Sequence, residues 1–173
     1  TVAVDVKKVP GVVGATPFTY NQAMISATGG VIGAVIRGVD PKTAGEVTVL
    51  PEKIKKGSLS SLSEPAREGA EHVQGIVIGI ELARNIDAAL GDRISVISPM
   101  GTMTPAGPVP RMASFKVTGI FEVGMYEYDS SLAFISLPDS QRFFRMGDAA
   151  TGVEVKIADI YEAEKIDDDI MTR

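Results

Sequence analysis

The serine residues near the middle of the chain are the first candidates for chemistry, because a hydroxyl becomes a nucleophile when a base stands beside it. Ser58, Ser60, Ser61 and Ser63 are close in sequence, but none lies in a Gly-x-Ser-x-Gly nucleophile elbow. The chain has no cysteine, and its single histidine, His72, would have to serve as the base. The sequence therefore gives little support to a hydrolase and none to thiol catalysis.

Metal and nucleotide sites are also poorly supported by residue spacing. His72 has no second histidine or cysteine to complete a metal site. The three aspartates at 167–169 lack the alternating ligands and glycine turn of a calcium loop, and are typical of a solvated helix face. Gly75 and Gly79 bracket an apolar strand instead of following it, so they do not form a phosphate-binding turn. We expect no metal and no cofactor.

A proline-rich segment at 99–110 is the strongest functional candidate. It reads Pro-Met-Gly-Thr-Met-Thr-Pro-Ala-Gly-Pro-Val-Pro and holds four of the ten prolines and two of the seven methionines. Because proline cannot donate to a ladder, we expect a protruding hairpin loop between strands at 93–98 and 115–121. Residues 93–121 contain no carboxylate, but they contain Arg93, Arg111 and Lys116. A stiff, locally basic loop with adaptable methionines predicts partner docking; the alternative is a disordered connector.

The segment Gly-Met-Tyr-Glu-Tyr-Asp at 124–129 is a second candidate, placed between two expected strands. In an extended segment Tyr126 and Tyr128 would face one side, and Glu127 and Asp129 the other. We interpret it as a strand edge or corner whose tyrosines pack on the core. The alternative is contact with a partner subunit, because tyrosine is favoured at interfaces.

The bulk composition is that of an ordinary globular protein. The 173 residues are 45% hydrophobic and 23% charged, with a net charge of -5. This acidic balance argues against a nucleic-acid partner. No apolar run approaches the roughly 18 residues of a membrane helix. The chain starts at Thr1 without a signal-peptide pattern and stops at Arg173 inside an expected helix, which suggests a domain excised from a longer protein.

Hydrophobic periodicity places these candidates on an α+β framework. Alternation is clearest at 152–157, and Asp159 with Glu162 then forms a capping-box pattern that opens a final helix. We expect the 152–157 strand to share a sheet with the β-rich segment 12–39, whose Gly29-Gly30 pair predicts a hairpin turn. The other expected elements are a short helix ended by Pro10-Gly11, a strand at 75–79, a helix at 81–90, a strand at 132–137 and a helix at 138–144.

Several of these segments together resemble the permease subunits of the lipoprotein-releasing ABC transporter of Gram-negative bacteria, the LolC/LolE type, over nearly the whole chain. The Gly-Ile-Glu-Leu-Ala piece at 79–83 and the Leu-Gly-Asp piece at 90–92 also recur in broader MacB-type permeases. Thr-Pro-Ala-Gly at 104–107 with Pro110, and Gly-Met-Tyr-Glu-Tyr-Asp-Ser at 124–130, are more specific to the lipoprotein branch. Further matching segments lie at 9–17, 36–41 and 90–96.

The resemblance implies a MacB-like periplasmic core of α+β class, from the periplasmic domain of a Gram-negative inner-membrane protein. Residues 1–44 and 138–173 would form a discontinuous, membrane-proximal porter-like subdomain, and residues 45–137 an inserted, strand-rich distal subdomain. The implied partners are a LolA-type periplasmic lipoprotein carrier, a second permease subunit, a cytoplasmic ATPase subunit and the lipoprotein substrate.

Within this family the proline-rich loop of the LolC-type subunit is a protruding hook that recruits the carrier. Carried over by position, the hook is residues 99–110. The residues expected to bind the partner are Pro99, Met100, Thr102, Met103, Thr104, Pro105, Gly107, Pro108 and Pro110, with Arg93 and Arg111 nearby. The family's polar, basic patch beside the hook corresponds here to Ser95, Met112 and Ala113, none of them charged. Arg93 and Arg111 are the residues available to replace that patch.

The leading hypothesis is therefore a non-enzymatic docking domain of a lipoprotein-releasing permease. One alternative is the periplasmic domain of a MacB-like efflux permease, which would have no need of the proline-rich hook. A second alternative is a soluble periplasmic hydrolase, which would need a nucleophile and a base.

Overall fold

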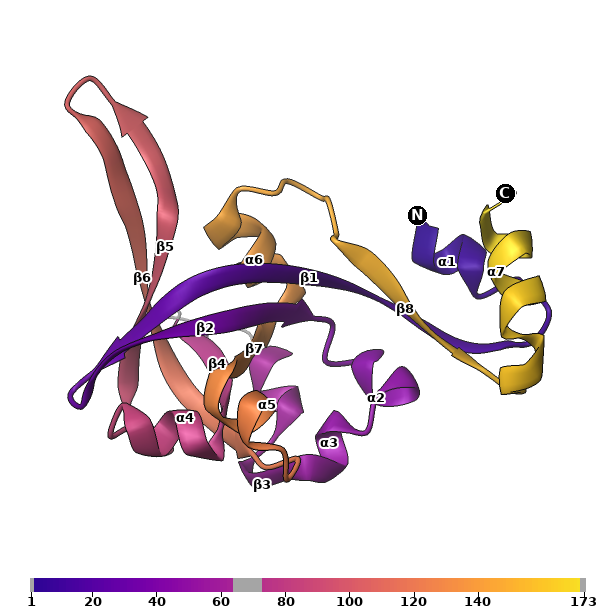
Figure 1. Ribbon diagram of the computed structural model, residues 1–173, viewed down its shortest axis with the longest axis horizontal. Helices are drawn as coiled ribbons and strands as arrows, with labels where there is room; N and C mark the ends of the chain where they lie inside the picture. The colour runs from indigo at the N-terminus through magenta and orange to yellow at the C-terminus, as the bar shows by residue number, and fades with distance from the viewer. Residues whose placement is uncertain (1, 64–72, 172–173) are drawn as a thin grey trace.

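The strands and helices alternate irregularly along the chain in this computed structural model, which describes residues 2–63 and 73–171 (Figure 1). The strands are β1 Val12–Ala27, β2 Gly30–Val39, β3 Ile54–Gly57, β4 Gln74–Gly79, β5 Arg93–Thr104, β6 Gly107–Phe121, β7 Leu132–Ser136 and β8 Gly152–Ile157. The helices are α1 Val2–Val6, α2 Ala44–Val47, α3 Leu50–Lys53, α4 Ile80–Asn85, α5 Tyr126–Ser131, α6 Leu137–Phe144 and α7 Ala163–Met171, with 3-10 turns at Leu59–Ser63 and Ile160–Glu162. No helix among the described residues combines the length and the apolar character required to cross a bilayer.

All the described strands belong to one sheet whose pairings close on themselves. The order is β2-β7-β4-β6-β5-β1, and β1 then pairs with β2 again; β8 adds to β1 and β3 to β6. The 16-residue β1 makes closure possible because it pairs with β2, β5 and β8 along different parts of its length. Closing a sheet in this way satisfies backbone groups that would otherwise lie on open edges.

The main core fills the inside of this circuit with aliphatic and aromatic side chains from most of its strands. Ile25 of β1, Ile36 of β2, Ile78 of β4 and Phe115 of β6 are completely buried in it. Phe143 of α6 covers one end and meets the Phe115 ring edge-on at 6.2 Å. Segments 12–39 and 75–121 therefore share one core. The division into 1–44 with 138–173 and 45–137 stays a prediction.

The expected pairing of the 152–157 strand with segment 12–39 is confirmed, and Asp159 caps a 3-10 turn that precedes the final helix. Strand β8 pairs with β1 in antiparallel register, with Val12 opposite Ile157 and Ala15 opposite Val155. The Asp159 side chain caps the next turn by accepting from the Tyr161 backbone N–H at 2.9 Å. The buried side chain of Ile166 in α7 lies against Gly11, in the turn that follows α1.

The helix expected at 81–90 is shorter than its sequence pattern predicts, because α4 ends at Asn85. The Ile86 carbonyl accepts a hydrogen bond from Gly29 N–H at 2.9 Å, and a Cβ at Gly29 would overlap the backbone of Ile86. Asp87 then adopts a positive φ of 51°, which stops the helix. The turn between β1 and β2 thus determines where α4 ends, and local periodicity does not carry that information.

Candidate functional site

The segment 99–110 forms the distal part of the β5–β6 hairpin, which extends away from the body of the molecule (Figure 1). At its base Ile94 and Val96 of β5, with Phe115 and Val117 of β6, are buried in the main core. This anchoring means that four buried side chains fix the direction in which the hairpin projects. The outer part lies beyond the pair Ser98 and Arg111.

The prediction of a twelve-residue loop between strands at 93–98 and 115–121 is wrong in its boundaries. Both strands continue to the tip, where Thr104 pairs with Gly107 across a two-residue turn. Prolines are tolerated because this ribbon has just two strands, and a missing N–H can point to solvent. Ladder pairing lapses between Ser98 and Thr102, where the register shifts.

Two local features hold this ribbon in shape. At Gly101 the strands approach so closely that a Cβ would overlap the carbonyl oxygen of Val109. At the tip, the Thr104 hydroxyl donates to the Gly107 carbonyl at 2.7 Å and accepts from the Ala106 backbone N–H at 3.3 Å. Gly107 has a φ of 112°, a conformation that favours glycine. The tip is therefore an ordered turn.

One face of the hairpin is apolar and exposed. Cross-strand partners share a face, so Met103 lies beside Pro108, and the alternation along β6 places Pro110 and Met112 on the same side. Met103 is 78% exposed, and Met100, in the irregular stretch, is 86% exposed. Large apolar side chains with this exposure are typical of an interaction surface when they are contiguous.

The opposite face connects the hairpin to the body. Arg111 Nη1 donates to the Phe143 carbonyl of α6 at 2.6 Å, which braces the hairpin where it leaves the core. Arg93, by contrast, pairs with Lys116 at the start of β5. Pro99 lies six positions after Arg93, which is about 20 Å along the strand. The structure thus brings Arg111 to the base of the hook and leaves Arg93 at the far end of the strand.

The positions matching the family's basic patch do come together at the hairpin base. Ser95 pairs with Ser114, Val96 with Ala113, and Ile97 with Met112. Of these, Met112 is an exposed apolar side chain. These three positions therefore carry no charge, and the nearest cation is Arg111, next to Met112.

The segment 124–129 is not the strand edge expected from alternation, because residues 126–131 form the helix α5. The Asp129 carboxylate is buried and accepts from the backbone N–H groups of Val123 at 2.8 Å and Gly124 at 3.0 Å, which holds the chain at the helix entry. The tyrosines do not pack on the core: Tyr126 is 65% exposed, and Tyr128 is also exposed. The interpretation of 124–129 as a strand edge or corner whose tyrosines pack on the core is therefore wrong.

The residues considered for catalysis and metal binding do not assemble a site in the described part of the chain. The Ser58 and Ser60 hydroxyls contact each other at 2.9 Å, and the Ser61 hydroxyl donates to the Ser58 carbonyl. His72 and its neighbours at 64–71 lie outside the described residues. Among residues 2–63 and 73–171 there is no cluster of three His, Cys, Asp or Glu side chains that could hold a metal ion.

Comparison with known proteins identifies the fold and the family. The family model of the MacB-like periplasmic core domain matches residues 1–173. This chain belongs to that family. The MacB-like core is a periplasmic domain of ABC transporter permeases, a family of transporters and not of enzymes.

Relatives within the family place the chain with the LolC/LolE type. The lipoprotein-releasing system transmembrane protein LolC of Xylella fastidiosa strain Temecula1 is 35% identical over 164 residues, 95% of this chain and 38% of its own length. LolC of Neisseria meningitidis serogroup B is 32% identical over 149 residues, 86% of this chain and 34% of its own length. The chain thus spans little more than a third of these relatives.

Solved structures share the fold at low sequence identity. The periplasmic region of MacB from Actinobacillus actinomycetemcomitans gives a TM-score of 0.62 at 14% identity, covering 99% of this chain and 70% of that one. The extracellular domain of the noncanonic ABC-type transporter YknZ from Gram-positive bacteria gives 0.63 at 12% identity, covering 95% and 75%.

Proposed function

We propose that this MacB-like core is the periplasmic docking domain of a permease that releases lipoproteins from the inner membrane and passes them to a LolA-type carrier. The carrier would bind the hook, residues 99–110. The projection of the β5–β6 hairpin, with exposed Met100 and Met103 on it, is the observation that carries this proposal. The names of the LolC relatives, which belong to a lipoprotein-releasing system, support it.

Docking through the hook would combine a low loss of conformational entropy with adaptable apolar contact. Four prolines and the anchored strands restrict the hook before binding, so less conformational freedom is lost on docking. Methionine side chains are flexible and polarizable, and they fit apolar surfaces of irregular shape. The absence of carboxylates from 93–121 removes repulsion toward an acidic partner surface.

The remaining partners follow from the same family. A second permease subunit, of the same or paralogous type, would complete the periplasmic part of the transporter. A cytoplasmic ATPase subunit would act through membrane segments of the permease, and the lipoprotein would be the transported substrate.

The test is a binding titration of the purified chain with the LolA-type carrier of the same organism. A variant whose residues 99–110 are replaced by a short Gly-Ser turn should lose carrier binding, and its melting temperature should stay nearly unchanged because the hook lies outside the core. A matched control is Thr28→Asn, at the exposed tip of the β1–β2 hairpin.

Two outcomes would contradict the proposal. If the hook-deleted chain bound the carrier with unaltered affinity, the exposed tyrosines of α5 would become the next candidate surface. If the intact chain did not bind the carrier, the periplasmic domain of a MacB-like efflux permease would become the favoured alternative.

A further inference from the structure

A pocket of about 380 Å³ lies beside the sheet, away from the hook. Its walls are apolar: Phe121 of β6 and Phe134 of β7 meet edge-on with centroids 5.4 Å apart, and Leu50 of α3 closes the side toward the helices. Its rim includes the exposed side chains of Val49 and Met125. This volume lies at the lower end of the range for small-molecule pockets, which are mostly apolar with a few polar groups.

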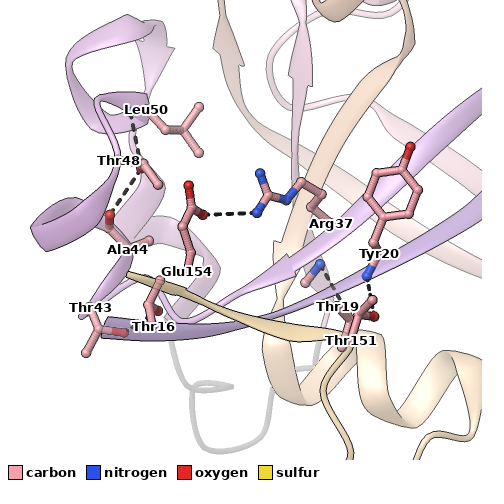
Figure 2. A network of polar contacts seen from close by, with 11 residues as sticks. Thr16, Thr19, Tyr20, Arg37, Thr43, Ala44, Thr48, Leu50, Thr151 and Glu154 are labelled. Atoms are coloured by element: carbon pink, nitrogen blue, oxygen red, sulfur yellow. Dashed lines mark hydrogen bonds and ion pairs between the residues drawn. The ribbon is translucent and has the colours of Figure 1, made fainter. Parts of the chain in front are cut away.

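The polar groups gather around Arg37 of β2. Its Nη2 donates to Glu154 Oε2 of β8 at 3.0 Å, and its guanidinium carbon lies 4.6 Å from the centre of the Phe18 ring. In Figure 2 the Arg37 and Glu154 side chains meet opposite Thr48 and Leu50. Both ionic side chains line the pocket, as does Lys53, so its lining carries one positive charge in excess.

Arg37 has unused hydrogen-bonding capacity. Among the described residues, Nη2 has a hydrogen-bond acceptor, whereas Nε is buried without one. A buried guanidinium nitrogen without a partner is costly. A ligand with an anionic oxygen would supply an acceptor at this guanidinium.

We propose that this pocket binds an aliphatic carboxylate, with its chain between Leu50 and the Phe121–Phe134 wall and its head at Arg37. An aliphatic chain fits better than a peptide, because a buried peptide backbone needs hydrogen-bond partners. The threonines that line the pocket already use their hydroxyls: Thr16 contacts Thr43 at 2.6 Å, and Thr48 donates to the Ala44 carbonyl at 3.1 Å. A singly charged head fits better than a doubly charged one because Glu154 stays beside Arg37.

The experiment follows methionine methyl signals by NMR in the full chain while octanoate is added below its micelle concentration. Met125 lines the pocket, whereas Met103 lies on the hook. We expect a saturable shift of the Met125 signal with no matching change at Met103. Octanol and octylammonium, which have the same chain without the negative charge, should bind about tenfold more weakly.

Two variants test the two ends of the pocket. Arg37→Met should weaken octanoate binding about tenfold and abolish its advantage over octanol. Val49→Glu places a charge on the apolar rim and should also weaken binding, while Val31→Glu, at a similarly exposed valine of β2 outside the pocket, should not. Val49→Glu keeps the test valid if Arg37→Met unfolds the chain.

The proposal is overturned if Met125 does not respond, if octanol binds as tightly as octanoate, or if Met103 shifts along the same binding curve. The last outcome would indicate general association with exposed methionines. Deletion of residues 99–110 should leave octanoate binding unchanged, so failure here and failure of carrier docking are distinguishable.

Discussion

At Gly101 the two strands of the hook come so close that the absence of a side chain decides whether they can pair. A Cβ there would overlap the Val109 carbonyl oxygen, which is backbone and cannot rotate away. We expect Gly101→Ala to separate the strands and to lower carrier affinity by about tenfold or more, equivalent to ~1.4 kcal/mol. The measurement is a carrier titration of the variant, with its melting temperature recorded in parallel.

Gly33→Ala is the matched control, because Gly33 lies in β2 with open space around its missing side chain. This control should bind the carrier normally. Equal affinity for the Gly101→Ala variant and the unaltered chain would mean that strand pairing in the hook is not needed for docking.

The two arginines near the hook should differ in importance, because the structure separates them. Arg111 donates to Phe143 at the hairpin base, while Arg93 lies beside Lys116 at the other end of β5. We expect Arg111→Glu to weaken carrier binding severalfold, through lost bracing and reversed charge, and Arg93→Glu to weaken it less. Titrations at low and high salt check this, since the charge contribution shrinks with ionic strength. A larger effect at Arg93 would argue against the hook as the contact.

At the level of elements, strong short-range patterns predicted the structure well. The alternating strand at 152–157 and the capped turn at Asp159 are present. The hairpin expected at Gly29-Gly30 is also present, but its turn lies one residue earlier, at Thr28 and Gly29 between the paired residues Ala27 and Gly30. Each of these signals lies within a few residues of the feature that it specifies. The segment 99–110, expected as a loop between two strands, instead belongs to β5, β6 and the turn that joins them.

The errors arise where a particular hydrogen bond or packing contact, and not hydrophobic periodicity, decides the local structure. Helix α5 is too short to show a helical period, and it depends on the buried Asp129 carboxylate holding the backbone of Val123 and Gly124. The end of α4 depends on Gly29, more than fifty positions earlier in the chain. The pocket at Arg37 also escaped prediction, because residues of five strands (β1, β2, β6, β7 and β8) and three helices (α2, α3 and α5) meet there only after folding.

Helix α7 provides a test of how separate elements support one another. Gly11 follows the first helix, and the buried side chain of Ile166 lies nearest to the position that a Cβ of residue 11 would take. Ile166→Ala should remove about 2–5 kcal/mol of packing at this contact, and hydrogen exchange should speed up in α1 and α7 while β4 stays protected. Ile160→Ala, at an exposed isoleucine, is the control and should change neither. Faster exchange spread over the whole sheet would contradict this local role.

For the whole molecule, the closed circuit of strands predicts a single cooperative unfolding transition. Ile25 and Ile36, from the first part of the chain, lie in the same core cluster as Ile78 and Phe115. We expect urea unfolding followed by far-UV circular dichroism and by tyrosine fluorescence to give coincident curves. Two separated transitions would instead indicate that residues 45–137 fold as an independent unit.

The arrangement of the two ends has a mechanical consequence. Strand β1 begins just after α1 and β8 ends just before α7, and the antiparallel pair starts with Val12 opposite Ile157. A load that draws α1 away from α7 therefore peels β8 from β1 one hydrogen bond at a time, in the manner of a zipper, and does not strain the whole ladder at once. The β1–β8 pairing should therefore separate at low force. The closed circuit of the other strands should stay intact, so that the projecting hairpin keeps its orientation.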